Sequence, residues 1–531
     1  NSEPSEIGDF YSQLILGQVY EGLVSINPAD LTIQPQIASK IDVTNNGLRY
    51  TFTIRDDVYF HNIGLSSNDR KLTPQDVVYS IKKACTKKNN KTPSNAFSLV
   101  YKNLLRGATD FYDKKTSSIS GLSIKGNKVI MDLLQEDNNF LQKLSLISCA
   151  VISEKKSELN TEIVGTGPFI LLQNNVTDER LLLLKNADYY SYDRAGNALP
   201  YLDSLEFIIN TKKLEQFDIF ENHVTDIILG LPTSRITKML QGRIEDFNSK
   251  PPLFILHNNP GLVTNYYFFN MANERFKDKK VRQAFNYAIN KEKIGQNILR
   301  NQFYELGHYG IVPPLNSIFR GYNFKGIRER GYLYDPEKAK ALLASAGYPE
   351  GKGFGNVTLR FNIDDIHSAV ADEFSKQIKQ VLNINVNIDG STFQQLTVDG
   401  DNGNGDIFRT GWAADYPSPE SFLNNFFGEL VPNNPNDPSH FNPSRYINDQ
   451  FDNYLKKGKY TNKLAESQKY FSMADRELLL DPPFIPLWYN GEIQIAYSNV
   501  RNLNFNAMDL FVFKEVYKKE WTKEEFQKKM K

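Results

Sequence analysis

The sequence predicts a multidomain α/β protein, and three observations support this fold class. The chain has 531 residues, which at roughly 150 residues per domain is enough for three or four domains. Hydrophobic residues make up 40% and charged residues 23% of the chain, a composition typical of folded globular proteins. Between residues 368 and 415 helical and strand patterns alternate, which indicates layers of helices on a sheet.

The N-terminal region is predicted to hold strands and turns over residues 17–60, followed by a helix. After a turn signal at 45–47, apolar and polar residues alternate over 48–55 as in a half-buried strand. Residues 73–76 (TPQD) then have the order of an N-cap, a first-turn proline and an acidic residue close to a capping box. A helix is therefore expected to start at Pro74.

The rest of the chain is predicted to continue this alternation. Strands are expected at 128–134, 169–172, 181–184, 384–388 and 407–413, and helices at 278–299 (two in tandem), 335–347 and 370–381. Two stretches rich in Gly, Asn, Asp and Pro, at 399–406 and 432–443, are predicted to be surface connections.

Charge and hydropathy exclude two classes of protein. Lysine plus arginine equals aspartate plus glutamate, 62 each, whereas a nucleic-acid binder needs a basic excess to replace phosphate counterions. No apolar run approaches the ~20 residues that cross a bilayer. Because the chain starts at Asn1 without a methionine, we expect a processed or trimmed form, from which export cannot be read directly.

The sequence gives no support for a metal, a cofactor or a known catalytic motif. Cys85 and Cys149 are not in metal-ligand spacing; we predict two buried thiols, with a single disulfide as the alternative. The six histidines form no HExxH motif, and GxSxG, GxxxxGK[ST] and GxGxxG are missing. The acidic residues at 399–406 do not follow the EF-hand pattern. A glycosidase, which needs only two carboxylates, stays open as an alternative.

Several segments, in order, resemble the solute-binding proteins of ABC importers, specifically the peptide/nickel-binding family (family 5), and among these the oligopeptide-binding proteins. They are VYEGLV at 19–24, LRYTFTIRDDVYF at 48–60, LTPQDVVYS at 72–80, GTGPF at 165–169, YFFNMANERFKDKKVRQAFNYAINKEKI at 267–294, DPEKAKALLASAGYP at 335–349 and GWAADYPSPESF at 411–422. The chain departs from the family pattern at 1–15, which lacks the usual Leu-Asp-Pro.

The resemblance implies a two-lobed periplasmic-binding-protein type II (Venus-flytrap) fold with an extra inserted domain. Domain I would be discontinuous and comprise residues 1–48, 167–263 and 485–531. Domain II, residues 49–166, would be inserted into it to complete lobe 1. Domain III, residues 264–484, would form lobe 2.

Asp415 is the first candidate ligand-binding residue that the resemblance implies. It follows an apolar strand and precedes Tyr416-Pro417. In oligopeptide binders similar to this chain, the Asp at this place pairs with the α-ammonium group of the peptide. A cation taken out of water needs such a partner. The alternative is an aspartate that only caps the following turn.

Arg409, Trp412 and His367 are expected near Asp415 on the same resemblance. Arg409 and His367 would neutralise the ligand carboxylate at different peptide lengths, and a guanidinium suits a carboxylate because it donates two hydrogen bonds. Trp412 would line a side-chain pocket. The alternatives are a solvent-facing or internally paired arginine, an exposed loop histidine on the way into a helix, and a core tryptophan.

Two strand segments are candidates for main-chain pairing with an extended peptide. One is Glu21, Gly22 and Leu23, and the other runs from Arg409 to Ala413. Tyr267, Trp488 and Tyr489 are further candidate wall residues, with core packing as the alternative.

Together these observations predict a receptor that captures short peptides in the cleft between its lobes by domain closure and delivers them to a membrane permease. We expect an ABC permease and its ATPase as partners, a monomer, and no cofactor, metal or nucleic acid. The expected location is extracytoplasmic, in the periplasm or on the outer membrane face, with a lipid anchor on an N-terminal segment absent from this chain. An oligosaccharide or other non-peptide ligand is the alternative; a peptide- or glycan-hydrolysing enzyme is a distant one.

Overall fold

The computed structural model describes residues 3–520 except 8, 64, 89–92, 157–162, 177–178, 211, 230–247 and 249–251. The chain forms two compact units. Unit 1 comprises Asn1–His257 and Ile493–Lys531, and unit 2 comprises Asn258–Glu492. The chain therefore passes from one unit to the other twice, within two long strands. The further division of unit 1 into two domains stays a prediction.

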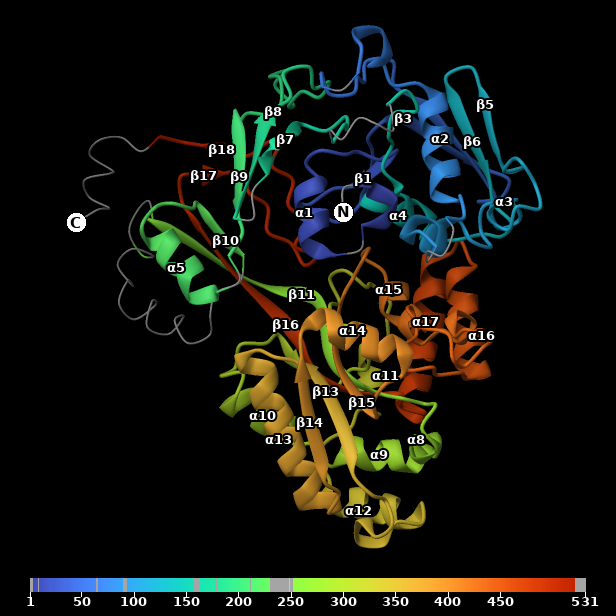
Figure 1. Ribbon diagram of the computed structural model, residues 1–531, viewed down its shortest axis with the longest axis vertical. Helices are drawn as coiled ribbons and strands as arrows, with labels where there is room; N and C mark the ends of the chain where they lie inside the picture. Colours follow the sequence, from blue (N-terminus) through green and yellow to red (C-terminus); the bar gives the residue numbers. More distant parts are fainter. Residues whose placement is uncertain are drawn as a thin grey trace. The chain divides into compact units, whose positions relative to one another are not determined.

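Unit 1 contains a four-stranded and a three-stranded antiparallel sheet (Figure 1). The four-stranded sheet has the order β3 (Ala38–Thr44), β4 (Arg49–Ile54), β6 (Lys128–Asp132), β5 (Leu122–Lys125), and the three-stranded sheet has the order β7 (Phe169–Val176), β8 (Arg180–Lys185), β9 (Ser204–Ile208). The remaining strands are β1 (Val24–Ile26), β2 (Ile33–Pro35), β10 (Ile227–Leu229), β17 (Val500–Arg501) and β18 (Tyr517–Lys518). The helices are α1 (Phe10–Leu16), α2 (Pro74–Ala84), α3 (Ala108–Tyr112), α4 (Phe140–Leu144) and α5 (Lys213–Glu221).

The predicted capped helix of unit 1 is confirmed. Helix α2 starts at Pro74, and the backbone N–H of Thr73 donates to Oδ2 of Asp76 at 2.8 Å, as in a capping box. Cys85 caps the other end of α2, and Cys149 lies in a 3₁₀ turn. Both carry free thiols, with Cys85 buried and Cys149 half-buried as a residue. Burial of its thiol raises the pKa of Cys149 to about 12.

Unit 2 has the α/β layering that the alternating pattern predicts. Its strands are β11 (Phe254–Phe269), β12 (Glu305–Leu306), β13 (Val357–Asn362), β14 (Val386–Ser391), β15 (Ile407–Ala413) and β16 (Phe484–Tyr497), of which β11 and β16 carry the two crossings. Its helices are α8 (Glu274–Lys277), α9 (Lys279–Tyr287), α10 (Lys291–Asn297), α11 (Phe324–Arg328), α12 (Pro336–Ser345), α13 (Asp365–Leu382), α14 (Phe393–Asn402), α15 (Glu420–Leu423), α16 (Asp449–Lys459) and α17 (Leu464–Leu480). Strands β13 and β14 are parallel and α13 connects them, as Figure 1 shows.

Two helices of unit 2, α10 and α12, start where the sequence predicts, whereas α13 starts five residues before the expected 370. Asn290 accepts from the N–H of Lys293 at 2.9 Å and caps α10, and Asp335 accepts from the N–H of Lys338 at 3.0 Å and caps α12. Apolar residues of α9, α12 and α13 then pack with those of β11, β13 and β14 into one core.

The predicted surface connections are wrong in part. Helix α14 continues to Asn402, and Asp399 is buried because its carboxylate pairs with the Nη1 of Arg360 at 3.0 Å. Asn442 is also buried, and its Nδ2 donates to the carbonyl groups of Phe427 at 3.1 Å and Tyr446 at 2.9 Å. Polar residues can be buried when each donor finds an acceptor.

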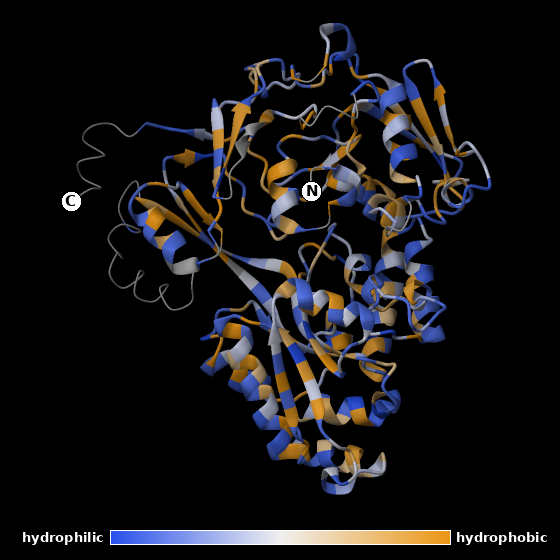
Figure 2. Ribbon diagram, in the orientation of Figure 1, coloured by the Kyte–Doolittle hydropathy of each residue, from blue (hydrophilic) through white to orange (hydrophobic). Residues whose placement is uncertain are grey.

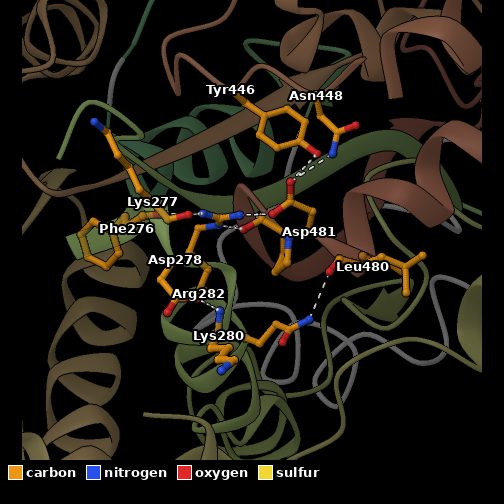
Figure 3. A network of polar contacts seen from close by, with 12 residues as sticks. Phe276, Lys277, Asp278, Lys280, Arg282, Tyr446, Asn448, Leu480 and Asp481 are labelled. Atoms are coloured by element: carbon orange, nitrogen blue, oxygen red, sulfur yellow. Dashed lines mark hydrogen bonds and ion pairs between the residues drawn. The ribbon is translucent and has the colours of Figure 1, made fainter. Parts of the chain in front are cut away.

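A polar network fixes the start of β16 (Figure 3). The buried guanidinium of Arg282 donates from Nε to the carbonyl of Pro482 at 2.8 Å and pairs with the carboxylate of Asp481. Asn448 also donates to Asp481, at 3.0 Å. The partner of this buried charge is thus provided within unit 2. The network anchors the strand that carries the candidate residues Trp488 and Tyr489.

In the part of the chain that the structure describes, no helix combines the length and the apolar character needed to span a membrane. In Figure 2 the helices instead carry hydrophobic and hydrophilic segments along the same element. The described residues also contain no group of three or more His, Cys, Asp or Glu side chains that could hold a metal ion.

Candidate functional site

Strand β15 organises most of the predicted site residues. In its antiparallel register with β11, Arg409 lies opposite Tyr267 and Trp412 lies opposite Thr264. Because side chains alternate between the two faces of a strand, Arg409 and Trp412, three residues apart, project to opposite faces. The single neighbourhood expected for Arg409, Trp412 and His367 is therefore divided into two clusters, one on each face.

One edge of β15 is largely open. Its pairing with β11 extends from Val263↔Ala413 to Phe269↔Ile407, whereas on the other edge β13 pairs only with Ile407 and Phe408. Among the described residues, no strand pairs with 409–413 on that second edge. These five residues present backbone groups of the kind that an added strand can use.

The first cluster surrounds Asp415, just beyond the end of β15. The backbone N–H of Asp415 donates to Oγ of Ser421 at 2.9 Å, and the Ser421 hydroxyl lies 3.4 Å from the Oδ2 of Asp415. The indole Nε1 of Trp412 lies 3.5 Å from the same Oγ. Ser421 thus contacts both Asp415 and Trp412, two of the predicted site residues.

The carboxyl group of Asp415 lies deep in the protein although the residue as a whole is half-buried. Burial raises its pKa to about 7, and the Ser421 hydrogen bond opposes only part of that shift. Within the described residues no Lys, Arg or His forms an ion pair with it. An aspartate that only capped a turn would not need to be desolvated, so this arrangement suits a carboxylate that receives a cation from outside the chain.

The second cluster surrounds Arg409. Its Nη1 donates to Oδ1 of Asn362 at 3.0 Å and its Nη2 donates to Oδ1 of Asn265 at 2.9 Å. Its Nε is buried without a hydrogen-bond partner in the described structure. Burial lowers the pKa of the guanidinium to about 10, with the nearby Asp364 acting in the opposite direction, so Arg409 stays charged at neutral pH.

His367 joins the cluster of Arg409, but not from a loop. It lies in the first turn of α13, and its N–H donates at 2.7 Å to Oδ1 of the N-cap Asp364. Its ring stacks on Trp488, with centroids 6.1 Å apart and planes at 24°. The indole Nε1 of Trp488 donates to Oδ1 of Asn490 at 3.1 Å. The alternative of an exposed loop histidine is wrong, because the residue lies in the first turn of the helix that Asp364 caps.

The remaining predicted wall residues are buried in packing. Tyr267 is 1% exposed and its ring lies edge-on to Phe374. Tyr489 is fully buried, and its hydroxyl donates to the carbonyl of Gly310 at 2.7 Å. Their contacts are those of core residues of unit 2.

The strand predicted at Glu21–Leu23 is wrong, because β1 begins only at Val24. The carbonyl groups of Glu21, Gly22 and Leu23 accept from Val151, Ile37 and Gln36, respectively, which leaves them engaged within unit 1. The Glu21 carboxylate accepts from Tyr189 at 2.7 Å and Thr166 at 3.0 Å. Burial raises its pKa, and these hydrogen bonds lower it in part.

Four residues of the two clusters were not predicted from the sequence, namely Asn265, Asn362, Ser421 and Asn490. One signal was present: Asn265 is a polar residue within an apolar strand segment, VTNYYFF. A polar residue at such a position needs a partner. Its partner Arg409 is 144 residues away, so sequence patterns could not identify it.

Known proteins are similar to this chain over most of its length. The structure of DppA from Helicobacter pylori in complex with the peptide STSA matches with a TM-score of 0.79 and 22% identity, covering 98% of this chain and 96% of that one. The oligopeptide-binding protein OppA of Bacillus subtilis is 23% identical over 97% of this chain and 90% of its own length. Heme-binding protein A of Haemophilus influenzae is 25% identical over 88% of this chain and 81% of its own length.

The family model described as bacterial extracellular solute-binding proteins, family 5, matches residues 32–434. The chain belongs to this family. The α/β class, the periplasmic-binding-protein fold and the extracytoplasmic location predicted from the sequence are thereby confirmed. The family consists of binding proteins of transporters rather than enzymes.

Proposed function

We propose that the chain is the receptor of an ABC importer that binds short peptides with a free α-ammonium group. The observation that carries this proposal is Asp415, a desolvated carboxylate with no cationic partner among the described residues. An ammonium group bound there would replace lost water with an ion pair.

The other end of the peptide would be received by Arg409, with His367 beside it. Between the two clusters, the open edge of β15 from Arg409 to Ala413 would pair with the ligand main chain. At about 3.3 Å per residue the four steps from Arg409 to Ala413 span about 13 Å, which matches about five residues of extended peptide. Main-chain pairing is independent of side chains, so such a site would accept varied sequences.

Closure of the two lobes around the ligand, and delivery to a permease with its ATPase, complete the proposal. They rest on the family relationship. We also propose that the chain binds its ligand without chemical change. The names of its relatives include binders of oligopeptides, glutathione and haem, so the family allows other ligands, and it is Asp415 that favours peptides.

Native mass spectrometry of the purified protein tests the ligand class. A series of co-purifying masses that fragment as peptides supports the proposal, whereas one uniform sugar mass would contradict it. Incubation with the same peptides should return them intact, and the appearance of cleavage products would overturn the non-catalytic assignment.

Substitution of Asp415 tests the ammonium contact. Asp415→Asn should weaken a free-amine peptide by at least about tenfold, as loss of a charged hydrogen bond predicts, but leave its N-acetylated form unchanged. Asp372→Asn, on the exposed face of α13, is the matched control and should affect neither. Equal losses for both peptide forms would rule out the ammonium assignment.

A further inference from the structure

A closed circuit of contacts within unit 2 surrounds the guanidinium of Arg409. Asn265 accepts from Arg409 and donates at 2.7 Å to Asn490, which accepts from Trp488. A second series of contacts connects Trp488 back to Arg409. The ring of Trp488 stacks on His367, and the N–H of His367 donates to Asp364. Asp364 also accepts from the Nδ2 of Asn362 at 3.1 Å. Asn362 also accepts from Arg409.

Both groups that hold the guanidinium are uncharged amides. A buried arginine usually pairs with a carboxylate, because an unpaired buried charge is costly. Here Asn362 accepts from Arg409 and donates to the acidic side chain of Asp364. The amides fix the direction of the guanidinium, and among the described residues no carboxylate forms a direct ion pair with it; Asp364 acts on its charge only from beyond Asn362.

Gly411 makes this placement sterically feasible. A Cβ atom on Gly411 would lie 3.1 Å from Oδ1 of Asn265 and 3.4 Å from Nη2 of Arg409. The first of these distances is shorter than ordinary van der Waals contact, so any side chain at 411 would displace the amide or the guanidinium.

We propose that Asn265 and Gly411 are positioning residues, which hold the guanidinium of Arg409 with an uncharged acceptor so that its charge stays available to a ligand carboxylate. This inference rests on the proposed function. It assigns to two residues other than Arg409 itself a role in distinguishing ligands with a charged end from ligands without one.

The test compares each peptide as its free acid and as its C-terminal amide, by calorimetry with the full chain. Wild type should bind the acid at least about tenfold more tightly, as expected for a desolvated bidentate contact. Asn265→Asp places a carboxylate on Nη2, and it should reduce this acid-to-amide ratio to near one while amide binding stays within about twofold. Asn265→Ala adds no carboxylate beside Arg409, so it should retain more of the acid-to-amide ratio than Asn265→Asp does.

Gly411→Ala provides a second route, because it disturbs the same hydrogen bond without adding charge. It should lower the ratio, whereas Gly400→Ala, whose Cβ would meet Phe268 only at an ordinary 3.4 Å, should leave it unchanged. Melting temperatures identify any variant that fails to fold. If either Asn265→Asp or Gly411→Ala does not fold, the acid-to-amide ratio of the other variant tests the positioning role.

The possible failures are distinguishable. If Asn265→Asp and Gly411→Ala are both folded and keep the wild-type ratio, the positioning role is wrong, although peptide binding through Asp415 stands. A wild-type ratio near one also overturns the inference. Absence of any peptide binding contradicts the proposed function itself.

Discussion

The Oγ of Ser421 lies 2.9 Å from the backbone nitrogen and 3.4 Å from the Oδ2 of Asp415, so one hydroxyl contacts both ends of the same residue. It also receives the indole N–H of Trp412 at 3.5 Å. Ser421 therefore fixes the orientation of the buried carboxylate relative to the strand that precedes it.

Removal of this hydroxyl should weaken ligand binding without changing the fold. Ser421→Ala removes a donor that stabilises the ionised Asp415, so a free-amine peptide should lose about fivefold to tenfold in affinity. Its N-acetylated form should bind as before. Ser418→Ala, which removes a hydroxyl that accepts from the N–H of Glu420 in the same turn, is the matched control. Titration calorimetry measures all four combinations, and equal effects of the two serine variants would contradict a specific role for Ser421.

Binding of free-amine peptides should depend on pH through Asp415. In the absence of ligand its pKa is about 7, so below pH 7 a proton must leave before an ammonium can pair with the carboxylate. Affinity should therefore rise by up to about tenfold per pH unit from pH 5.5 to 7. It should fall again above about pH 8, where the peptide amine loses its proton.

The control for this pH profile is Asp415→Asn, whose peptide affinity should not change between pH 5.5 and 7. Tryptophan fluorescence titrations at half-unit steps are sufficient, since Trp412 lies next to the carboxylate. A wild-type profile that is also flat over this range would show that Asp415 does not titrate with the ligand.

Asp475 should make the free energy of unfolding depend on pH. Its buried carboxyl group accepts from the N–H of Ile311 at 2.9 Å and the hydroxyl of Tyr322 at 2.8 Å, and burial raises its pKa to about 7. The unfolded group has a pKa of about 3.9. The folded state therefore binds the proton more tightly than the unfolded state. The resulting contribution to the free energy of unfolding, about 4 kcal/mol, is complete below about pH 4 and is lost as the pH rises through 7.

Urea unfolding at pH 5 and pH 8 checks this sign. Wild type should lose more stability between the two pH values than Asp475→Asn, in which the titrating group is absent. Asp372→Asn, exposed on α13, should behave as wild type. The same pH dependence in wild type and Asp475→Asn would show that Asp475 is not the titrating group.

Glu21 should matter for stability rather than for binding. Its carboxylate accepts from the hydroxyl groups of Tyr189 and Thr166 and from the amide of Gln36 at 3.0 Å. Glu21→Ala leaves buried donors unpaired and should lower the free energy of unfolding by about 3 kcal/mol. Peptide affinity measured on the folded variant should stay within about twofold. Glu154→Ala, an exposed site in the same unit, should change neither quantity.

Local features of the fold were predictable because their causes lie within a few residues. The strand predicted at 407–413 matches β15 with its correct bounds, and the cap residues Asn290 and Asp335 located two helix starts. Asp399 was misplaced because its ion pair with Arg360 is not a local property. A stretch rich in Gly, Asn and Asp is typical of a loop, and only the buried partner reveals that part of it is helical.

The site shows the same division. Asp415, Arg409 and His367 were found from a resemblance in motif order, but not their spatial grouping. The faces of Arg409 and Trp412 could have been assigned from their spacing of three, since strand side chains alternate. The partners of Arg409 could not, because Asn362 and Asn265 are 47 and 144 residues away.

By itself the sequence determined that this chain is an α/β solute-binding protein of an importer. It could do so because strand alternation, helix caps and the family motifs each depend on residues that are close together in the sequence. The tertiary structure alone decided which charges stay free. Burial and pairing depend on side chains brought together from distant segments, and these leave Asp415 without a counter-ion among the described residues and hold Arg409 with amides instead of an acid.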